Sequence, residues 1–386
     1  MEEGKDPNAT NVPKPNQSRL WPQGLVDQLL FVFIVLCFSL SLFVIYMTRQ
    51  TSVTTTTLIS SVPISQPCAH LKEQPETNLD HWIESPLNML HTMSDKELFW
   101  RASLVPQLKN CSFTRVPKIA FMFLTKGPLP LAPLWERFFK GHEGRYSIYI
   151  HSLPSYEAKF EPTSVFHGRQ IPSQVVEWGT MSMCDAERRL IANALLDISN
   201  EYFVLLSESC IPLYNFTLTY RYITNSEHSF MGAFDDPSSV GRGRYNYRMS
   251  PQVKLSQWRK GSQWFEIHRN LAYLIISDTT YYPVFKEHCR PACYVDEHYF
   301  PTMLSIQAPE SLANRSLTWV DWSRGGPHPA TFGKSDITEQ FIKNLRRARN
   351  CYYNGQPSEI CYLFARKFSP GSLEALLSFA FTDMGY

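Results

Sequence analysis

The chain has 386 residues, a formal net charge of +2 and 19% charged residues, a balance that argues against nucleic-acid binding. Aromatic residues make up 14%, with 9 Trp and 19 Tyr, which is typical of sugar-binding clefts but also of large cores. About 340 residues follow the apolar segment near the N-terminus, enough for one large or two modest cores.

That apolar segment, Leu29 to Met47, is 19 residues long and contains no charge. As a helix it would span roughly 28 Å, close to the thickness of a bilayer core. A cleaved signal peptide is disfavoured because 28 residues precede the segment and no small-residue cleavage pattern follows it. A buried helix would carry more polar interruptions than Ser39 and Ser41. The segment therefore predicts a membrane anchor at 29–47.

Flanking charges and composition predict how the rest of the chain is organised. Lys14 and Arg19 precede the anchor and only Arg49 follows closely, which places a tail of residues 1–28 in the cytosol. Residues 48–115 begin with a Thr- and Ser-rich stretch and are interpreted as a stem. Within it, Ser94 and Glu97 predict a capping box that starts a short helix. Residues 116–386 form the predicted lumenal domain.

Cysteines and glycosylation sequons agree with a lumenal domain. Eight cysteines follow the anchor and allow up to four disulfides, whose pairing the sequence leaves open. They are Cys68, Cys111, Cys184, Cys210, Cys289, Cys293, Cys351 and Cys361. Three Asn-x-Ser/Thr sequons on the same side predict N-glycosylation at Asn110, Asn215 and Asn314.

Strand and helix patterns alternate after residue 116. We predict strands at 119–125, 147–152, 175–179 and 202–208, and helices at 131–142 and 184–199. This alternation predicts an α/β fold with a mainly parallel sheet. Ligands of such sheets bind beyond the carboxyl ends of the strands. Those ends carry Leu124, Thr125, Lys126, His151, Gly179 and Glu208.

Several catalytic motifs are missing from the sequence. It contains no phosphate-binding P-loop, no dinucleotide-binding glycine motif after a strand, no nucleophile elbow and no zinc-protease motif. It also contains no Asp-x-Asp, the usual metal-binding signature of nucleotide-sugar transferases. The nearest acidic pair, Asp235 and Asp236, precedes a proline and is equally consistent with a turn.

Residues 286–304 hold the densest polar cluster. His288, Cys289, Cys293 and His298 could bind zinc, although disulfides are favoured in an oxidising lumen. Glu297 precedes an apolar run and could be a general base at a cleft or an acid at the start of a buried helix.

Two later segments also allow two interpretations. Trp319, Asp321 and Trp322 could form an aromatic wall for a sugar, or a strand with tryptophans in the core. The basic stretch 343–350 and the pair Arg366 and Lys367 could neutralise a leaving diphosphate, or they could lie on solvated surfaces.

Seven segments in order resemble the core-2/I-branching β-1,6-N-acetylglucosaminyltransferase family, in its plant branch, over residues 116–382. They are IAFMFLTKG, YSIYIHSLPSY, YFVLLSESCIPL, KGSQWFEIHR, YVDEHYFPTML, LTWVDWSRGGPHP and CYLFARKF. The resemblance implies a GT-A-like glycosyltransferase domain, a UDP-sugar donor, inversion at the anomeric carbon and no divalent metal or other cofactor. The missing Asp-x-Asp is consistent with it.

The resemblance also assigns residues to roles. It implies that Glu297 is the general base and that Lys367 holds the donor diphosphate together with Arg347 or Arg349. The implied donor side also includes Leu124, Thr125, Lys126, His151 and Gly179. The implied acceptor side includes Asp235, Asp236, Arg242, Arg244, Trp319, Asp321 and Trp322. His151 replaces an Asp that contacts uridine in animal members, so the donor could be UDP-N-acetylglucosamine or another UDP-sugar such as UDP-glucuronic acid.

These inferences predict a single-pass type II protein of the Golgi membrane that glycosylates a glycoprotein glycan or a plant cell-wall polysaccharide. One alternative is a non-catalytic lumenal protein that binds glycans on the same fold. Another is an anchored glycoside hydrolase, which would need two facing carboxylates, such as Glu208 and Glu297.

Overall fold

The computed structural model describes residues 32–37, 39–41, 89–104, 115–347 and 350–386. The chain divides into two units, residues 1–76 and 77–386. In the first unit, residues 32–37 and 39–41 are helical, and the hydroxyls of Ser39 and Ser41 donate to the carbonyls of Leu36 and Cys37. None of the helices in the described ranges has both the length and the apolar character needed to cross a bilayer. The expected tail, and part of the expected anchor, lie outside the described residues.

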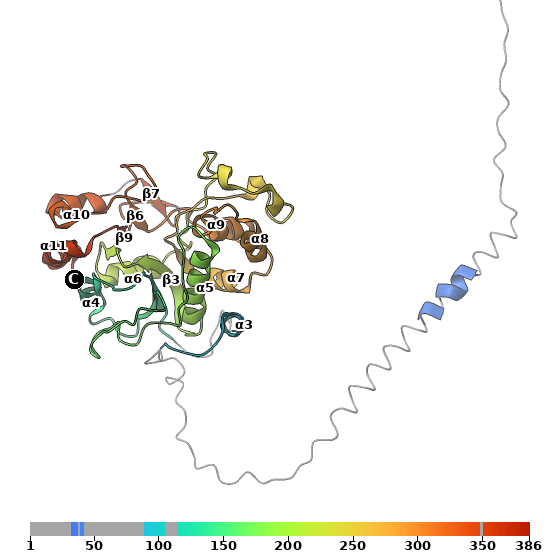
Figure 1. Cartoon of the computed structure of the whole chain (residues 1–386), viewed down its shortest axis with the longest axis horizontal. Coiled ribbons are helices and arrows are strands. Elements are labelled where there is room, and N and C mark those ends of the chain that lie inside the picture. The colour runs from blue at the N-terminus through green and yellow to red at the C-terminus, as the bar shows by residue number, and fades with distance from the viewer. Residues whose placement is uncertain (1–31, 38, 42–88, 105–114, 348–349) are drawn as a thin grey trace, which may run out of the picture. The chain divides into compact units, whose positions relative to one another are not determined.

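The second unit is built on a four-stranded sheet (Figure 1). Its strands are β1 (Lys118–Leu124), β2 (Tyr146–His151), β3 (Asn200–Ser207) and β5 (Glu266–His268), in the order β2-β1-β3-β5. β1 pairs in parallel with β2 and β3, and β5 pairs antiparallel with β3. All seven residues of β1 are buried, as expected for a central strand covered on both faces. The mainly parallel α/β sheet predicted from the sequence is confirmed.

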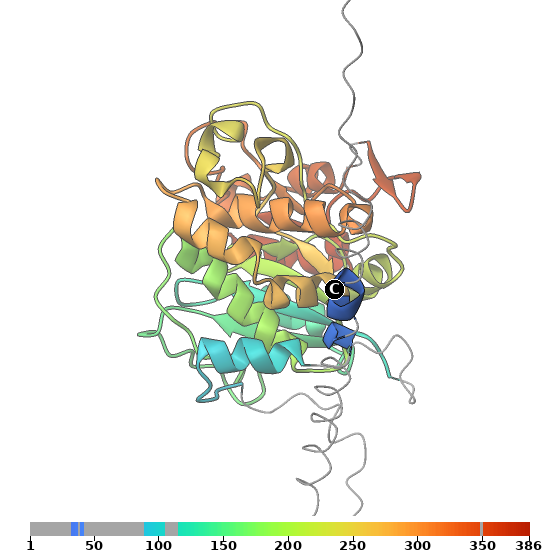
Figure 2. The ribbon, with the colours of Figure 1, turned by 90° about the vertical axis from the view of Figure 1, so that its right-hand side faces the viewer.

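Alternate residues of β1 and β3 pack into separate cores on the two faces of the sheet. Ala120, Met122 and Leu205 belong to one core, whereas Phe121 and Leu206 belong to the other. The first core includes residues of α3 (Asp95–Ser103), α5 (Met181–Leu195), α7 (Arg269–Ser277), α8 (Tyr281–His288) and α9 (Val295–Gln307). The second includes residues of α4 (Ala132–Phe139), α6 (Phe216–Thr224), α10 (Glu339–Arg346) and α11 (Leu373–Phe379). Figure 2 shows the helices of the first core facing the viewer.

Smaller elements complete the unit. A second sheet has the order β4-β9-β6, with β4 (Ile211–Pro212), β9 (Phe364–Arg366) and β6 (Thr318–Val320), and β7 (Cys351–Tyr353) pairs with β8 (Gln356–Ser358). The 3₁₀ turns are Arg242–Arg244, Tyr247–Met249, Leu255–Gln257, Pro309–Ser311, Lys334–Asp336 and Pro370–Ser372, and Ala380–Met384 is a π-helix.

The strand predicted at 175–179 is wrong. These residues form a loop and turn that lead into α5. Val175 and Trp178 are both exposed, so the apolar character of this segment does not contribute to a sheet. The neighbouring segment makes only a single bridge to β2, at Gln170.

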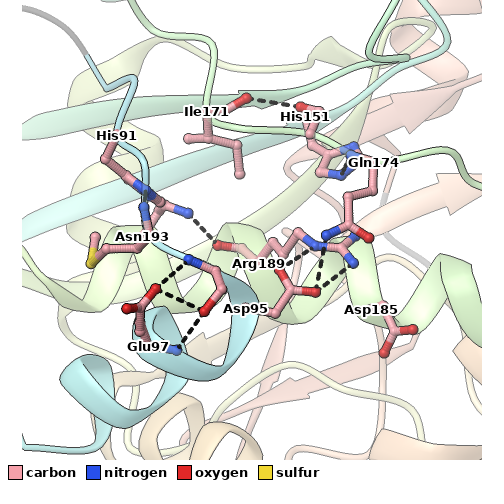
Figure 3. Close-up of polar contacts among 12 residues, drawn as sticks. His91, Asp95, Glu97, His151, Ile171, Gln174, Asp185, Arg189 and Asn193 are labelled. Carbon is pink, nitrogen blue, oxygen red and sulfur yellow. Dashed lines mark hydrogen bonds and ion pairs between the residues drawn. The ribbon is translucent and has the colours of Figure 1, made fainter.

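The folded unit begins before the predicted boundary at residue 116. Helix α3 lies in the range interpreted as stem, yet Leu98 and Ala102 are buried in the first core. The predicted capping box between Ser94 and Glu97 is present. Figure 3 shows that Asp95, in the first turn of this helix, forms a bidentate ion pair with Arg189 of α5, at 2.7 and 2.8 Å. Packing and a half-buried ion pair therefore join α3 to the domain.

Two disulfides form among the described cysteines, Cys289–Cys293 and Cys351–Cys361. The first excludes these two thiols from the zinc site considered above. Cys184 and Cys210 are buried free thiols, so these two do not contribute to the up to four disulfides that the sequence allows. They lie in the two different cores, which explains why they do not pair. Cys68 and Cys111 lie outside the described residues.

Candidate active site

Glu297 lies in the first turn of α9, where the acidic side chain complements the positive end of the helix. Pro301 lies four residues further along the helix and has no N–H to donate to the Glu297 carbonyl. The Gly261 N–H donates to that carbonyl instead, at 2.8 Å. A side chain at Gly261 would collide with the Gly232 carbonyl, so the close approach requires glycine. The proline thus lets a distant loop attach to the start of α9.

Two cations orient the Glu297 carboxylate. The Lys260 ammonium is 2.6 Å from Oε2 and the Arg244 guanidinium is 3.3 Å from the same oxygen. The Glu297 side chain is 24% exposed, so the group is anchored but accessible. Both contacts involve Oε2, and within the described residues Oε1 is left available to an incoming hydroxyl. We call Arg244, Lys260, Tyr294 and Glu297 the base cluster, since the Arg244 guanidinium also covers the Tyr294 ring at 3.9 Å.

Two buried acids lie beside the base cluster. Burial and, to a smaller extent, the neighbouring Glu297 raise the pKa of Asp296 to about 7. Burial also raises the pKa of Glu187 well above its usual range, and the nearby Asp296 acts in the same direction. Gln263 donates to Glu187 Oε1 at 2.8 Å, while Glu187 Oε2 and Asp296 Oδ1 are buried without a partner among the described residues. Both carboxyls are therefore held in a site that favours the protonated form.

A second charged group collects at the carboxyl ends of the strands. The charges of Arg366, Glu208 and Lys126 all act on Lys367. Burial lowers the pKa of Lys367, Arg366 and Lys126 lower it further, and Glu208 opposes them. We call Lys126, Arg366 and Lys367 the strand-end cations. Each of these charged residues lies at or just after the end of a strand. Lys126 follows β1, Glu208 follows β3, and Arg366 and Lys367 lie at the end of β9.

One loop contacts both groups. Lys260 and Gly261 bond to Glu297, and Trp264, three residues later, lies under the Arg366 guanidinium at 3.9 Å from its ring centroid. The Nε of Arg366 is buried and has no partner in the described part of the chain. The base cluster and Arg366, one of the strand-end cations, therefore contact the same loop.

The other residues expected on the donor side have varied surroundings. Leu124 and Thr125 are buried, and the Thr125 hydroxyl donates to the Gly127 carbonyl at 2.9 Å. His151 is only 1% exposed, and Figure 3 shows it beside Gln174 and Arg189. Burial and the nearby Arg189 lower the pKa of His151 to about 4, so the imidazole is neutral near pH 7.

Three more residues were expected on the donor side: Arg347, Arg349 and Gly179. Arg347 is exposed just after α10, and Arg349 lies outside the described residues. Gly179 has a φ of +76°, and a side chain there would contact the Tyr294 ring at 3.3 Å. The glycine therefore allows the base cluster to pack against the loop before α5.

On the expected acceptor side, Asp235 forms an ion pair with Arg242, at 2.7 Å between Nε and Oδ1, while Arg244 joins the base cluster. Asp236 accepts from the Ser238 N–H at 2.9 Å, which is the turn considered from the sequence. Its carboxylate is also influenced by Lys260 and His298, so the turn borders the base cluster.

The two tryptophans of the 317–329 segment have different environments. Trp319 packs on Phe332 and Phe341 in the second core, as the strand interpretation predicted. Trp322 is exposed beyond the end of β6. Asp321 accepts from the Ser323 N–H at 2.9 Å and orders the turn between them. Of these two tryptophans, only Trp322 therefore offers a large aromatic surface to a ligand.

The expected glycosylation sites remain predictions. The Asn215 side chain caps α6 by accepting from Leu218, and the exposed Asn314 accepts from Ala233. Asn110 lies outside the described residues. Within the described ranges, no three His, Cys, Asp or Glu side chains gather closely enough to hold a metal ion.

Sequence reasoning missed Lys260, Tyr294 and the packing of Arg366 on Trp264. Lys260 lies 37 residues before Glu297, and no local pattern connects the two. Tyr294 adopts a left-handed conformation, with a φ of +55°, which its residue type does not signal. Arg366 was noted beside Lys367, but its packing on Trp264 follows from tertiary structure alone.

Comparison with known proteins decides the family. The family model described as "Branch: Core-2/I-Branching enzyme" matches residues 119–346, more than half of the chain and all of the base cluster. The chain belongs to the Core-2/I-branching enzyme family. A rice protein (Oryza sativa subsp. japonica) named Glycosyltransferase BC10 is 39% identical over 298 residues, which cover 65% of this chain and 74% of the relative. The chain is a glycosyltransferase, and the family resemblance expected from the sequence is confirmed.

Proposed function

We propose that this glycosyltransferase moves a sugar from a UDP-sugar to a hydroxyl of an acceptor glycan, with inversion and without a divalent metal. The observation that carries the proposal is the Glu297 carboxylate, which is held by Arg244 and by Lys260, and the loop that carries Lys260 also contacts Arg366 through Trp264. This arrangement supports the proposal because the proposed general base and one of the proposed diphosphate cations both contact the loop of residues 260–264.

The reaction assigns one task to each group. The acceptor hydroxyl gives its proton to Glu297, and its oxygen forms a bond to the anomeric carbon from the face opposite the diphosphate. The bond between that carbon and the diphosphate breaks, and the electron pair leaves on the UDP oxygen. The strand-end cations stabilise the developing negative charge by charge-assisted hydrogen bonds. Inversion follows because a single displacement occurs at one carbon.

The compartment and the donor sugar belong to the same proposal. We propose a type II protein of the Golgi membrane, supported by the uncharged apolar segment at 29–47 and by two disulfides in the described domain. N-acetylglucosamine is the sugar that the family resemblance favours, and glucuronic acid is the alternative. The buried neutral His151 motivates that alternative, because an Asp occupies the position in animal members.

Glu297→Gln tests the proposal. This change keeps the shape of the side chain but removes the proton acceptor, so we expect transfer to fall about 10²- to 10⁴-fold while the melting temperature changes little. The full-length protein in detergent would be incubated with a panel of UDP-sugars, with galactan acceptors and with EDTA, and UDP release would be measured. Equal rates for the variant and the wild type would exclude Glu297 as the base. Loss of transfer in EDTA that added metal restores would exclude a metal-independent reaction.

The non-catalytic alternative gives a different result in the same assay. A glycan-binding protein on this fold would bind galactan without releasing UDP from any donor, and Glu297→Gln would not alter that binding. A glycoside hydrolase would release sugar from the glycan when no UDP-sugar is present.

A further inference from the structure

Trp178 lies in a well-ordered turn and is nevertheless 52% exposed. The Thr180 hydroxyl donates to the Glu177 carbonyl at 3.0 Å, and the Glu177 N–H donates to the Ser182 hydroxyl at 2.8 Å. These bonds fix the turn just before α5. Large aromatic side chains that gather in an exposed patch are typical of binding surfaces.

Trp178 is part of a surface made from three separate segments. Its ring contacts the Tyr294 ring edge-on, with centroids 4.9 Å apart at 76°, and the His328 ring at 5.2 Å and 46°. Tyr294 precedes α9, and His328 lies in the exposed segment after β6. The glycine at position 179 allows the Tyr294 ring to pack against the turn. We call Trp178, Tyr294 and His328 the aromatic platform.

The aromatic platform adjoins the base cluster. Tyr294 belongs to both: its ring lies under Arg244, and its carbonyl accepts from the Glu297 N–H at 2.9 Å. Arg244 in turn bonds to the Glu297 carboxylate. A ligand on the platform therefore lies beside the proposed base, whereas the donor diphosphate is assigned to the strand-end cations.

We propose that the aromatic platform is a second sugar subsite, which holds a pyranose of the acceptor glycan beyond the sugar that is attacked. A pyranose has an apolar C–H face that suits an aromatic ring and a rim of hydroxyls that suits polar neighbours. The exposed Glu177 and the cation Arg244 provide such neighbours. The proposal rests on the proposed function and extends it: the preferred acceptor is an oligosaccharide rather than a single sugar.

Acceptors of two lengths test the subsite. The full-length protein would be assayed with a β-1,3-linked galactose hexasaccharide and with methyl β-galactoside. We expect Trp178→Ala to raise KM for the hexasaccharide about tenfold, to leave KM for the monosaccharide within twofold, and to leave donor hydrolysis without acceptor unchanged. Trp178→Phe keeps an aromatic face and should restore most of the difference. Trp100→Ala removes a tryptophan of similar exposure (66%) from α3 and is the matched control.

Binding without donor gives a readout that does not depend on turnover. Saturation-transfer NMR with the hexasaccharide should show contact in the wild type and in Trp178→Phe, and weaker contact in Trp178→Ala. Equal KM and equal NMR contact for Trp178→Ala and wild type would overturn the subsite while leaving the transferase intact. A wild type that binds the hexasaccharide through Trp178 but transfers no sugar would support the subsite and contradict the proposed function.

Discussion

The base cluster and the strand-end cations differ in charge balance. In the base cluster one carboxylate faces two cations, and the direct ion pairs largely satisfy one another. At the strand ends three cations face one carboxylate, Glu208, and burial together with mutual repulsion lowers the pKa of Lys367. The first arrangement is complete in the free protein, whereas the second gains most from an anionic ligand. We therefore expect the base cluster to orient the Glu297 carboxylate and the strand-end cations to receive an anionic ligand.

The largest expected effect in this comparison comes from removing a strand-end cation. Lys367→Ala should lower kcat/KM for the UDP-sugar about 100-fold, because a charge-assisted contact to the diphosphate contributes about 2–3 kcal/mol. The variant should also lose most of the rise in melting temperature that UDP produces in the wild type.

The matched control for Lys367→Ala is Lys343→Ala. Lys343 is exposed on α10 and forms an ion pair with Glu339 one turn away. The Lys343→Ala variant should keep the wild-type kcat/KM for the UDP-sugar and the wild-type rise in melting temperature with UDP. Equal UDP stabilisation in Lys367→Ala and wild type would remove Lys367 from the donor site.

Asp296 provides a test next to the base cluster, because it is a buried acid directly before Glu297 in the sequence. Its pKa is raised from 3.8 to about 7 in the folded protein. Between about pH 4 and 7 the folded state keeps a proton that the unfolded state has lost, so the wild type loses stability as pH rises. Asn cannot ionise, so Asp296→Asn should gain about 2 kcal/mol relative to wild type between pH 5 and pH 8.

Denaturant unfolding of both proteins at pH 5 and pH 8 measures this difference. The buried His151 and His298 titrate at low pH in both proteins, so their contributions cancel in the comparison. An unchanged difference between the two pH values would show that Asp296 is ionised in the folded protein throughout this range.

The sequence predicts the sheet well because its signals are local. The apolar runs of β1, β2 and β3 are complete within six to eight residues, and their burial follows directly. The segment 175–179 has similar composition but lies in a turn, because tertiary contacts with Tyr294 rather than strand pairing fix it. Apolar composition alone does not distinguish these two situations.

The site was only partly predictable for the same reason. Glu297 and Lys367 could be nominated by resemblance to a family. The attachment of Lys260 to Glu297 depends on a loop that is distant in sequence and on the free carbonyl created by Pro301. Trp319 and Trp322 look equivalent in the sequence, but only Trp319 lies within β6 and is covered by the second core. Such differences follow from long-range packing.

The smallest effect is expected from Lys260, which acts through Glu297. Lys260→Gln removes the closest cation from the Glu297 carboxylate, so the base should be less well positioned and kcat should fall about tenfold, a loss of about 1.4 kcal/mol. KM for the donor should stay within twofold because the strand-end cations are intact, and Lys260→Arg should recover most of kcat. Lys254→Gln, an exposed lysine six residues earlier, is the control and should behave as wild type. A rise in donor KM with unchanged kcat would instead place Lys260 on the donor and remove the distinction between the two charged groups.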